Sequence, residues 1–269
     1  MDIEDIIIDE YEEVDVDERL GKVRSAFERT RSKGIIVTED GEYAGVITEK
    51  QLLQSHVEDS TKAGAMMLSA PRVDEHADVR DVARVLVEGD VKVAPVFAGE
   101  RLAGIITENA ILEAVIENLD VLTVGDIATE DVLSVSEDAT IGQVINLMRE
   151  NSISRAPVTN ENGYLTGVVT THDITDIVVR DMDKATTGDR GGDIERMLDI
   201  PVYDVMQSPV ETIDPDATVE TAVRTMLDER YSGLVVTSDP EDRLVAGIIT
   251  KTDVLRALTY TEDEHMDVQ

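Results

Sequence analysis

Gly45-Val46-Ile47-Thr48 is the first of four near-identical phrases in this chain. The other three are Gly104-Ile105-Ile106-Thr107, Gly167-Val168-Val169-Thr170 and Gly247-Ile248-Ile249-Thr250. They recur at roughly 60-residue intervals, with a longer interval before the fourth, and such a period is typical of a repeated supersecondary unit. Two β-branched residues followed by Thr predict a buried strand that runs into a helix N-cap. Because helix N-termini attract anions, each phrase marks a candidate ligand position.

The third repeat shows the pattern of the whole unit most clearly. Residues 131–135 alternate like a short strand, and Thr140 begins a helix with apolar residues on one face. Residues 156–159 and 164–169 predict a hairpin, and Thr170 caps a closing helix. The predicted fold class is therefore α/β, with four repeats of the order β-α-β-β-α. A unit of about 60 residues is marginally stable alone, so we expect the repeats to pair.

The repeats set the expected domain boundaries. We expect the four repeats at residues 1–58, 60–119, 121–180 and 198–260, a linker at 181–197 and a tail at 261–269. The linker is polar and rich in glycine, which favours a connecting segment. A phosphate contact through Arg190 is the less favoured interpretation of the same stretch.

The charge of the chain restricts its environment and its partners. The 269 residues carry a net charge of −34 and are 42% hydrophobic. An acidic chain can be disordered, but the strong apolar periodicity of this one argues against disorder. Mimicry of nucleic acid by the acidic surface is a second explanation of the charge. We favour the cytosol of a salt-accumulating microbe, because molar salt screens self-repulsion beyond about 3 Å. Binding to duplex nucleic acid is not expected, since it needs clustered Lys and Arg.

The remaining composition points to a cytoplasmic protein. The chain has no Cys, and its acidic start lacks the basic residues of a secretory signal. No stretch has the apolar length of a membrane span, so no membrane association is expected. The four histidines are not at metal-ligand spacing, so we expect no metal site.

The repeated order of elements and the phrase Gly-h-h-Thr-x-x-Asp resemble the CBS domain, named for cystathionine β-synthase. Four tandem copies resemble the archaeal stand-alone CBS proteins and the γ subunit of AMP-activated protein kinase. The resemblance implies that repeats pair into two Bateman modules, with adenosine-type ligands bound in clefts between the paired sheets. It implies no resident cofactor other than such a regulatory ligand, for example AMP, ADP, ATP or S-adenosylmethionine.

The resemblance also assigns candidate ligand-binding residues, all in the second pair of repeats. It gives the ribose to the motif aspartates and the phosphate or ribose to the residues before them. These residues are Thr170, His172 and Asp173 in the third repeat, and Thr250, Lys251, Thr252 and Asp253 in the fourth. The segments leading into the first hairpin strands add Ser154, Arg155 and Ala156, and Tyr231, Ser232 and Gly233. Arg155 and Lys251 are the natural charge partners for a phosphate.

A purely structural interpretation explains part of the same motif. Thr-x-x-Asp is close to a helix capping box, in which the Thr and an acidic or amide side chain bond each other's backbone amides. In the first repeat, Thr48 and Gln51 satisfy the box without any ligand. Gln51 and Ala110 replace the aspartate in repeats one and two, so we expect degenerate sites there.

We therefore expect a regulatory, non-catalytic protein that senses an adenosine-type ligand. An interaction scaffold with empty clefts is the first alternative, and a nucleotide-processing enzyme is the second. No positioned nucleophile or metal set supports the enzyme. The regulated protein partner is not identifiable from the sequence, and a homodimer is left open.

Overall fold

The computed structural model describes residues 1–30, 34–48, 51–52, 58–174, 196, 198–238 and 243–259. The chain divides into two compact units, one of Met1–Leu119 with the segment from Lys251, the other of Asp120–Thr250. The repeat boundaries given above stay predictions, because this division does not test them. The expected linker at 181–197, except Arg196, and the expected tail at 261–269 lie outside the described residues.

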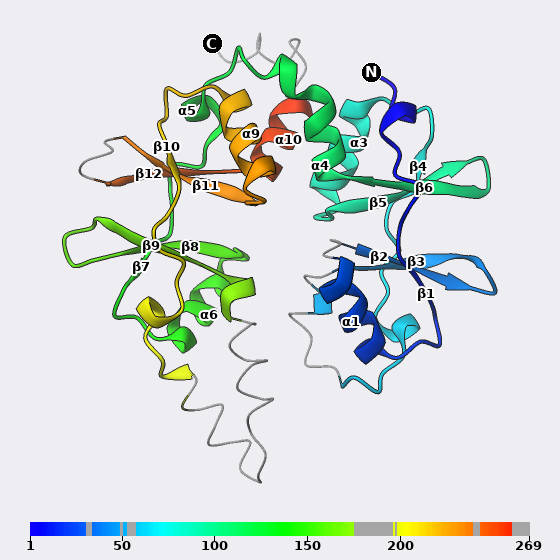
Figure 1. The fold of residues 1–269 in the computed structure, drawn as a ribbon, viewed down its shortest axis with the longest axis horizontal. Helices are drawn as coiled ribbons and strands as arrows, with labels where there is room; N and C mark the ends of the chain where they lie inside the picture. Colours follow the sequence, from blue (N-terminus) through cyan, green and yellow to red (C-terminus); the bar gives the residue numbers. More distant parts are fainter. Residues whose placement is uncertain are drawn as a thin grey trace. The chain divides into compact units, whose positions relative to one another are not determined.

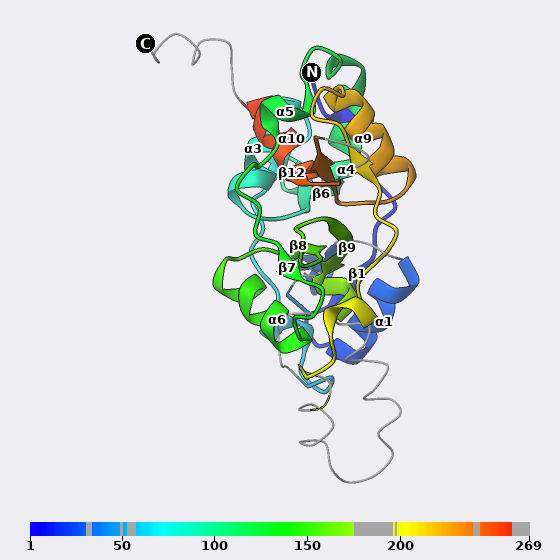
Figure 2. The ribbon, with the colours of Figure 1, turned by 90° about the vertical axis from the view of Figure 1, so that its left-hand side faces the viewer.

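Unit 1 contains the first two repeats and the last helix of the chain (Figure 1). Repeat one comprises β1 (Glu13–Asp15), α1 (Leu20–Thr30), β2 (Gly34–Glu39) and β3 (Glu42–Thr48). Repeat two comprises β4 (Val73–Asp74), α3 (Val79–Glu88), β5 (Val93–Ala98), β6 (Arg101–Thr107) and α4 (Glu108–Val115). The short helix η1 (Glu4–Ile6) precedes β1, η2 (Ala63–Ala65) lies between the two repeats, and η3 (Ile116–Asn118) follows α4. The last helix, α10 (Lys251–Thr259), packs against α3 and α4 (Figures 1 and 2).

Unit 2 contains the third repeat and the strands and first helix of the fourth. It begins with α5 (Val124–Ile127), β7 (Val135–Ser136), α6 (Ile141–Glu150), β8 (Arg155–Thr159) and β9 (Leu165–Thr170). It continues with η4 (Val202–Asp204), β10 (Thr212–Ile213), α9 (Val219–Asp228), β11 (Gly233–Thr237) and β12 (Val245–Thr250). The predicted order of strand, helix, strand and strand is confirmed in all four repeats.

Each repeat forms its own three-stranded sheet, in which the first strand is parallel to the second and the second is antiparallel to the third. The first strands of repeats two, three and four are only two residues long. The strand expected at residues 131–135 is therefore shorter than predicted, because only Val135 and Ser136 find partners on β8. Alternation alone does not make a strand where no neighbouring strand supplies hydrogen bonds.

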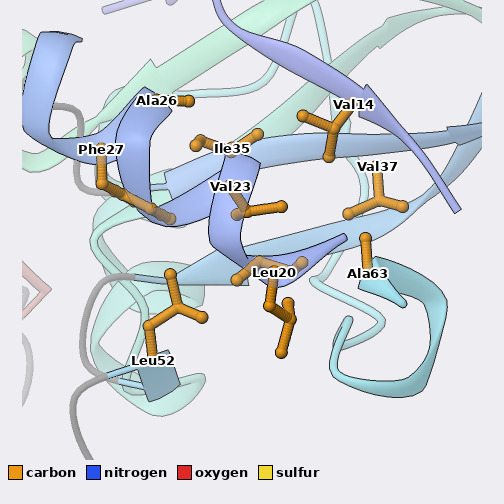
Figure 3. Close-up of a cluster of buried hydrophobic side chains, with 10 residues drawn as sticks. Val14, Leu20, Val23, Ala26, Phe27, Ile35, Val37, Leu52 and Ala63 are labelled. Atoms are coloured by element: carbon orange, nitrogen blue, oxygen red, sulfur yellow. The ribbon is translucent and has the colours of Figure 1, made fainter. Parts of the chain in front are cut away.

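The helix faces follow the predicted apolar spacing. Thr140 caps α6 in a capping box with Gln143, and Ile141, Val144 and Met148 are buried on one face. In repeat one, α1 covers its sheet through a cluster of aliphatic side chains with one aromatic ring (Figure 3). This cluster consists of Val14, Leu20, Val23, Ala26, Phe27, Ile35, Val37, Ile47, Leu52 and Ala63.

The repeats pair through reciprocal exchange of short segments. In unit 1, Val46 exchanges two backbone hydrogen bonds with Leu68 in the segment before β4, and Ile105 does the same with Ile8 before β1. In unit 2, Val168 pairs in the same way with Gln207, and Ile248 with Thr129. The last strand of each repeat is thus covered by the segment that leads into its partner. The pairing of repeats one with two and three with four, as in Bateman modules, is confirmed.

This exchange explains the glycine of the repeated phrase. A β-carbon on Gly104 would lie 2.5 Å from the Ile8 carbonyl oxygen, and one on Gly45 would lie 2.7 Å from the Leu68 carbonyl oxygen. Both distances are too short for a real β-carbon, so the lead-in segment of the partner repeat requires glycine at these positions. The glycine of the repeated phrase is therefore required for packing between repeats, and the residues that follow it form a strand.

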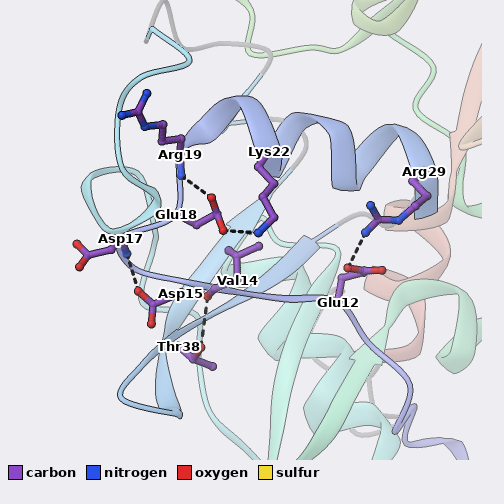
Figure 4. Close-up of polar contacts among 9 residues, drawn as sticks. All are labelled: Glu12, Val14, Asp15, Asp17, Glu18, Arg19, Lys22, Arg29 and Thr38. Atoms are coloured by element: carbon purple, nitrogen blue, oxygen red, sulfur yellow. Dashed lines mark hydrogen bonds and ion pairs between the residues drawn. The ribbon is translucent and has the colours of Figure 1, made fainter.

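The acidic surface carries scattered ion pairs, as around α1 (Figure 4). Arg29 Nη2 lies 3.0 Å from Glu12 Oε2, and Lys22 Nζ lies 2.5 Å from Glu18 Oε2. With 58 acidic and 24 basic residues, most carboxylates in the chain cannot have a basic partner of their own. None of the helices in the described residues is long and apolar enough to cross a membrane.

Candidate functional site

One polar contact between the paired repeats of unit 2 joins Arg155 to Ser232, beside Gly233. The Arg155 guanidinium donates a short hydrogen bond to Ser232 Oγ. Its Nη1 lies 2.5 Å from the place that a β-carbon on Gly233 would occupy. Gly233 therefore leaves the space into which this cation extends. Three of the predicted site residues are brought together here, two from repeat four and one from repeat three.

The hairpins place these residues beside the motif threonines. Arg155 is the register partner of Thr170, and Gly233 is the register partner of Thr250. Ser154 contacts the start of the helical turn at 171–174. The Thr171 amide donates a hydrogen bond of 2.9 Å to the Ser154 carbonyl oxygen. The contact between the repeats thus lies at the end of each hairpin where the closing helix begins.

Asp173 completes a capping box with Thr170. Its Oδ2 accepts from the Thr170 amide at 2.8 Å and from Thr170 Oγ1 at 2.6 Å. The Asp173 amide in turn donates to Thr170 Oγ1 over 3.3 Å. The structural interpretation of the motif is therefore confirmed for this repeat. It does not exclude a ligand, because a carboxylate has further lone pairs.

The other carboxylate oxygen of Asp173 has a partner that the sequence did not reveal. Gln207 Nε2 donates to Asp173 Oδ1 over 2.7 Å. Gln207 lies in the segment before β10 that pairs with Val168 of β9. The residue type gave no signal in the sequence, since the segment that leads into repeat two has the apolar Leu68 at the equivalent place.

The same box occurs elsewhere in the chain. In repeat one, Gln51 Oε1 accepts from the Thr48 amide at 3.0 Å, as predicted, while Gln51 Nε2 donates to the Met66 carbonyl oxygen. At the start of α5, Asp126 Oδ2 accepts from the Thr123 amide at 2.8 Å and from its hydroxyl at 2.7 Å. Capping alone therefore accounts for a Thr-x-x-Asp sequence outside the repeated phrase.

The predicted residues of the fourth repeat divide between the units. Thr250 ends β12 in unit 2, whereas Lys251, Thr252 and Asp253 begin α10 in unit 1. Asp253 is buried and forms an ion pair of 3.1 Å with Arg256.

Lys251 and Thr252 contact repeat two. Lys251 is only 5% exposed, and its Nζ donates to Asn109 Oδ1 over 2.8 Å. Lys92 Nζ donates to Thr252 Oγ1 over 2.6 Å and lies 2.7 Å from the buried Glu108 carboxylate. The sequence did not predict these contacts, because they join residues 142 and 160 positions apart.

The other predicted residues differ in accessibility. His172 and Ser232 are exposed, Tyr231 is half-buried and Ala156 is fully buried in β8. Ala156 can therefore offer a ligand its backbone only, as the resemblance implied for this segment.

One surface group could supply metal ligands. In the part of the chain that the structure describes, Asp2, Glu4 and His76 place one candidate atom each within 4.8 Å of one another. His76 Nδ1 lies 3.7 Å from Asp2 and 3.9 Å from Glu4, which are ordinary separations for surface ion pairs. All three residues are exposed, and nothing buried directs them toward an ion.

Comparison with known proteins supports the repeat assignment. The CBS domain model matches residues 3–58, 63–117, 124–180 and 202–260. The chain is 27% identical over 227 residues to the uncharacterized protein MJ1404 of Methanocaldococcus jannaschii, covering 82% of this chain and 53% of that protein. It is 28% identical over 204 residues to the inosine-5'-monophosphate dehydrogenase of the same organism, covering 76% of this chain and 36% of the enzyme. The chain thus spans about half or less of these relatives' lengths.

Two solved structures share the fold over nearly the whole chain. One is MJ1225 of M. jannaschii, which has been proposed as an archaeal homologue of g-AMPK, with a TM-score of 0.81 and 19% identity over 96% of this chain and 99% of that one. The other is an uncharacterized conserved protein of Pyrococcus horikoshii, with a TM-score of 0.71 and 17% identity, covering 96% of this chain and 100% of that one. At these identities the likeness concerns the fold. Since the family model matches four segments that make up most of the sequence, this chain belongs to the CBS domain family.

Proposed function

We propose that this protein is a regulatory sensor whose second CBS pair binds an adenosine-type ligand such as AMP, ADP, ATP or S-adenosylmethionine. The observation that carries the proposal is the Arg155 guanidinium, which extends from repeat three to Ser232 and Gly233 of repeat four. A guanidinium suits a phosphate because its fork of donors matches two phosphate oxygens. In a chain with a net charge of −34, a cation at the junction of two repeats favours a negatively charged ligand group.

Asp173 suits the ribose in this proposal. Both hydroxyls of a ribose diol can donate to a carboxylate. The hydrogen bond from Gln207 occupies Asp173 Oδ1 in the protein alone. A ribose hydroxyl would take the place of this amide donor, while Oδ2 continues to cap the helical turn that follows Thr170. Ligand binding would thereby release Gln207, which belongs to the segment leading into the partner repeat.

The release of Gln207 suggests how binding would be signalled. A ligand can shift an equilibrium between two arrangements only by the difference in its affinity for them. A change in the segment before β10 would alter the pairing of repeats three and four. No catalytic step is part of this proposal.

Thermal unfolding of the full chain with a panel of adenosine compounds tests the proposal. A ligand at about 100 times its dissociation constant stabilises the folded state by about 2.7 kcal/mol, which gives a clear shift in melting temperature. We expect such a shift for at least one compound and a much smaller one for Arg155→Gln. Absence of a shift for every adenosine compound contradicts the proposal.

An interaction scaffold without ligand is the second candidate. It is favoured by the hydrogen bonds that both Asp173 carboxylate oxygens accept within the protein, and by the same capping box at Thr123 and Asp126. Under this interpretation, Asp173→Ala lowers the stability of the unliganded protein. No adenosine compound shifts the melting temperature of the wild-type protein. The thermal panel therefore separates the two candidates.

A further inference from the structure

The motif of repeat four contacts the motif of repeat two through the two residues that follow each motif threonine. These residues are Lys251 and Thr252 in repeat four, and Glu108 and Asn109 in repeat two. Lys251 Nζ donates to Asn109 Oδ1 over 2.8 Å. Lys92 Nζ donates to Thr252 Oγ1 over 2.6 Å and lies 2.7 Å from the Glu108 carboxylate. These five residues, here called the α10 anchor, all belong to unit 1.

Repeat three uses the same positions differently. Thr171 Oγ1 donates to the Ser154 carbonyl oxygen over 3.2 Å, within its own repeat, and His172 is exposed. Ser154 and Lys92 hold equivalent places, since each carbonyl oxygen accepts from the amide that follows the motif threonine. Repeat two therefore directs toward α10 the side chains whose counterparts in repeat three are candidate ligand contacts or lie beside them.

The α10 anchor is largely buried, so its charged groups depend on their partners. Lys251 is 5% exposed and Glu108 is 6% exposed. A buried charge is costly unless hydrogen bonds or an opposite charge compensate for the lost water. The Asn109 oxygen and the Lys92 ammonium provide such compensation, and they therefore hold the start of α10 on repeat two.

The α10 anchor begins directly after the residue that ends β12. Thr250 precedes Lys251 in the chain and is the register partner of Gly233. The Arg155 guanidinium extends beside Gly233, so this hairpin end belongs to the candidate site of the second pair. A binding site that is ordered in advance costs less to occupy. By fixing Lys251, the α10 anchor restricts the backbone at Thr250 before any ligand binds.

We propose that the motif of repeat two regulates the affinity of the candidate site in the second CBS pair, by holding the start of α10. Asn109 and Lys92 are positioning residues in this account, since they act through Lys251 and Thr252. The inference rests on the proposed function and deepens it, because it names the part of the first CBS pair that tunes the site. It also assigns a role to a repeat whose motif lacks the aspartate.

Calorimetric titration of the full chain with AMP, ATP and S-adenosylmethionine, each in turn, tests this inference. Asn109→Ala removes the acceptor from Lys251 and should weaken binding about 2- to 12-fold, on the scale of ordering one side chain. Asn109→Asp keeps an acceptor oxygen opposite the ammonium and should bind as the wild type does. Asn146→Ala, which removes an exposed amide bonded to Arg149 of the same helix, is the control and should leave the affinity unchanged.

Amide hydrogen exchange without ligand tests the α10 anchor independently. Asn109→Ala should speed exchange in peptides that span residues 245–259, which contain the end of β12 and α10. Peptides that span residues 141–150 should keep the wild-type rate, because α6 lies in unit 2 and has no part in the α10 anchor. Asn109→Asp should restore slow exchange at 245–259.

The outcomes separate this inference from the proposed function. Unchanged exchange at 245–259 in Asn109→Ala overturns the inference, whether or not a compound binds. Wild-type affinity of Asn109→Ala for a compound that binds overturns the inference while the proposed function stands. Failure of all three compounds to bind the wild-type chain overturns the proposed function and the inference together.

Discussion

Gln207 and Asp173 are joined by a hydrogen bond of 2.7 Å, although they lie 34 residues apart in the sequence. The bond connects the closing motif of repeat three to the segment that leads into repeat four. The same carboxylate caps a helical turn through its other oxygen. Asp173 therefore combines a local structural role with the position expected for a ligand contact, and substitutions can separate the two.

Asp173→Gln should preserve capping and weaken binding. Gln51 already fills the equivalent capping role in repeat one, so an amide at position 173 should leave the unliganded melting temperature nearly unchanged. An amide is a weaker acceptor for two ribose hydroxyls, so the ligand-induced shift should shrink.

Asp173→Ala is the matched control. It loses the cap as well, at a cost of about 0.5–2 kcal/mol on the scale of N-cap substitutions. A full ligand-induced shift in Asp173→Gln would restrict Asp173 to its capping role.

Lys92→Met should destabilise unit 1 more than an exposed lysine substitution does. It leaves the Glu108 carboxylate, only 7% exposed, without its ammonium partner and removes the donor to Thr252. The expected cost is about 1–3 kcal/mol, measured by denaturant unfolding.

Lys62→Met is a control with the same change in net charge. Its ion pair with Asp17 has side chains that are 64% and 72% exposed, so the expected cost stays below about 1 kcal/mol. Adding Glu108→Gln to Lys92→Met should restore part of the lost stability. Equal losses for the two lysine variants would show that the contacts of Lys92 with Glu108 and Thr252 stabilise the protein no more than an exposed ion pair does.

Stability at acid pH should depend on the capping box of α5. Hydrogen bonds from the Thr123 hydroxyl and amide lower the pKa of Asp126 below its usual value. A carboxyl group whose folded pKa is lowered adds stability above its unfolded pKa, and this stability is lost as the pH falls through the folded pKa.

Asp126→Asn should therefore flatten the dependence of unfolding free energy on pH below about 4, relative to the wild type. Thr123→Val, which removes one donor, should flatten it partly, whereas Thr123→Ser should not. Parallel curves for wild type and Asp126→Asn, obtained by denaturant unfolding at each pH, would contradict this account.

The fold should depend on salt. The net charge of −34 destabilises the compact state through self-repulsion, and molar KCl screens charges beyond about 3 Å. Salt also weakens the surface ion pairs around α1, but carboxylates far outnumber basic residues, so repulsion should dominate. We expect a melting temperature in molar KCl far above that in dilute buffer. Equal melting temperatures would remove the interpretation of a salt-adapted protein.

Local patterns predicted the repeats and their order of elements, because strand alternation, helix periodicity and Thr caps depend on residues close in sequence. The capping boxes of Thr48 with Gln51 and of Thr140 with Gln143 illustrate this. The glycines of the repeated phrase were visible in the sequence as a motif. The physical requirement for glycine was not predictable, because it comes from the close approach of the segment that leads into the partner repeat. The strand at 131–135 was overestimated because its length depends on its neighbour in the sheet.

The candidate site was predictable only in part. Arg155, Ser232 and Gly233 were named from a family resemblance, and the structure brings them together. The contacts of Gln207, Lys92 and Asn109 were not predictable, because they depend on which segments meet after folding. The division of the fourth motif between Thr250 and Lys251 also depends on where α10 packs.

Amide hydrogen exchange of the full chain, with and without a bound adenosine compound, tests the location of the site most directly. The account predicts slower exchange on binding in peptides that contain residues 154–156, 170–173 and 231–233. It predicts no change in peptides that contain Gly34 and Thr48, or Val93 and Thr107. Slower exchange confined to those peptides of the first pair, with residues 154–156 and 170–173 unaffected, would contradict a ligand site in the second CBS pair.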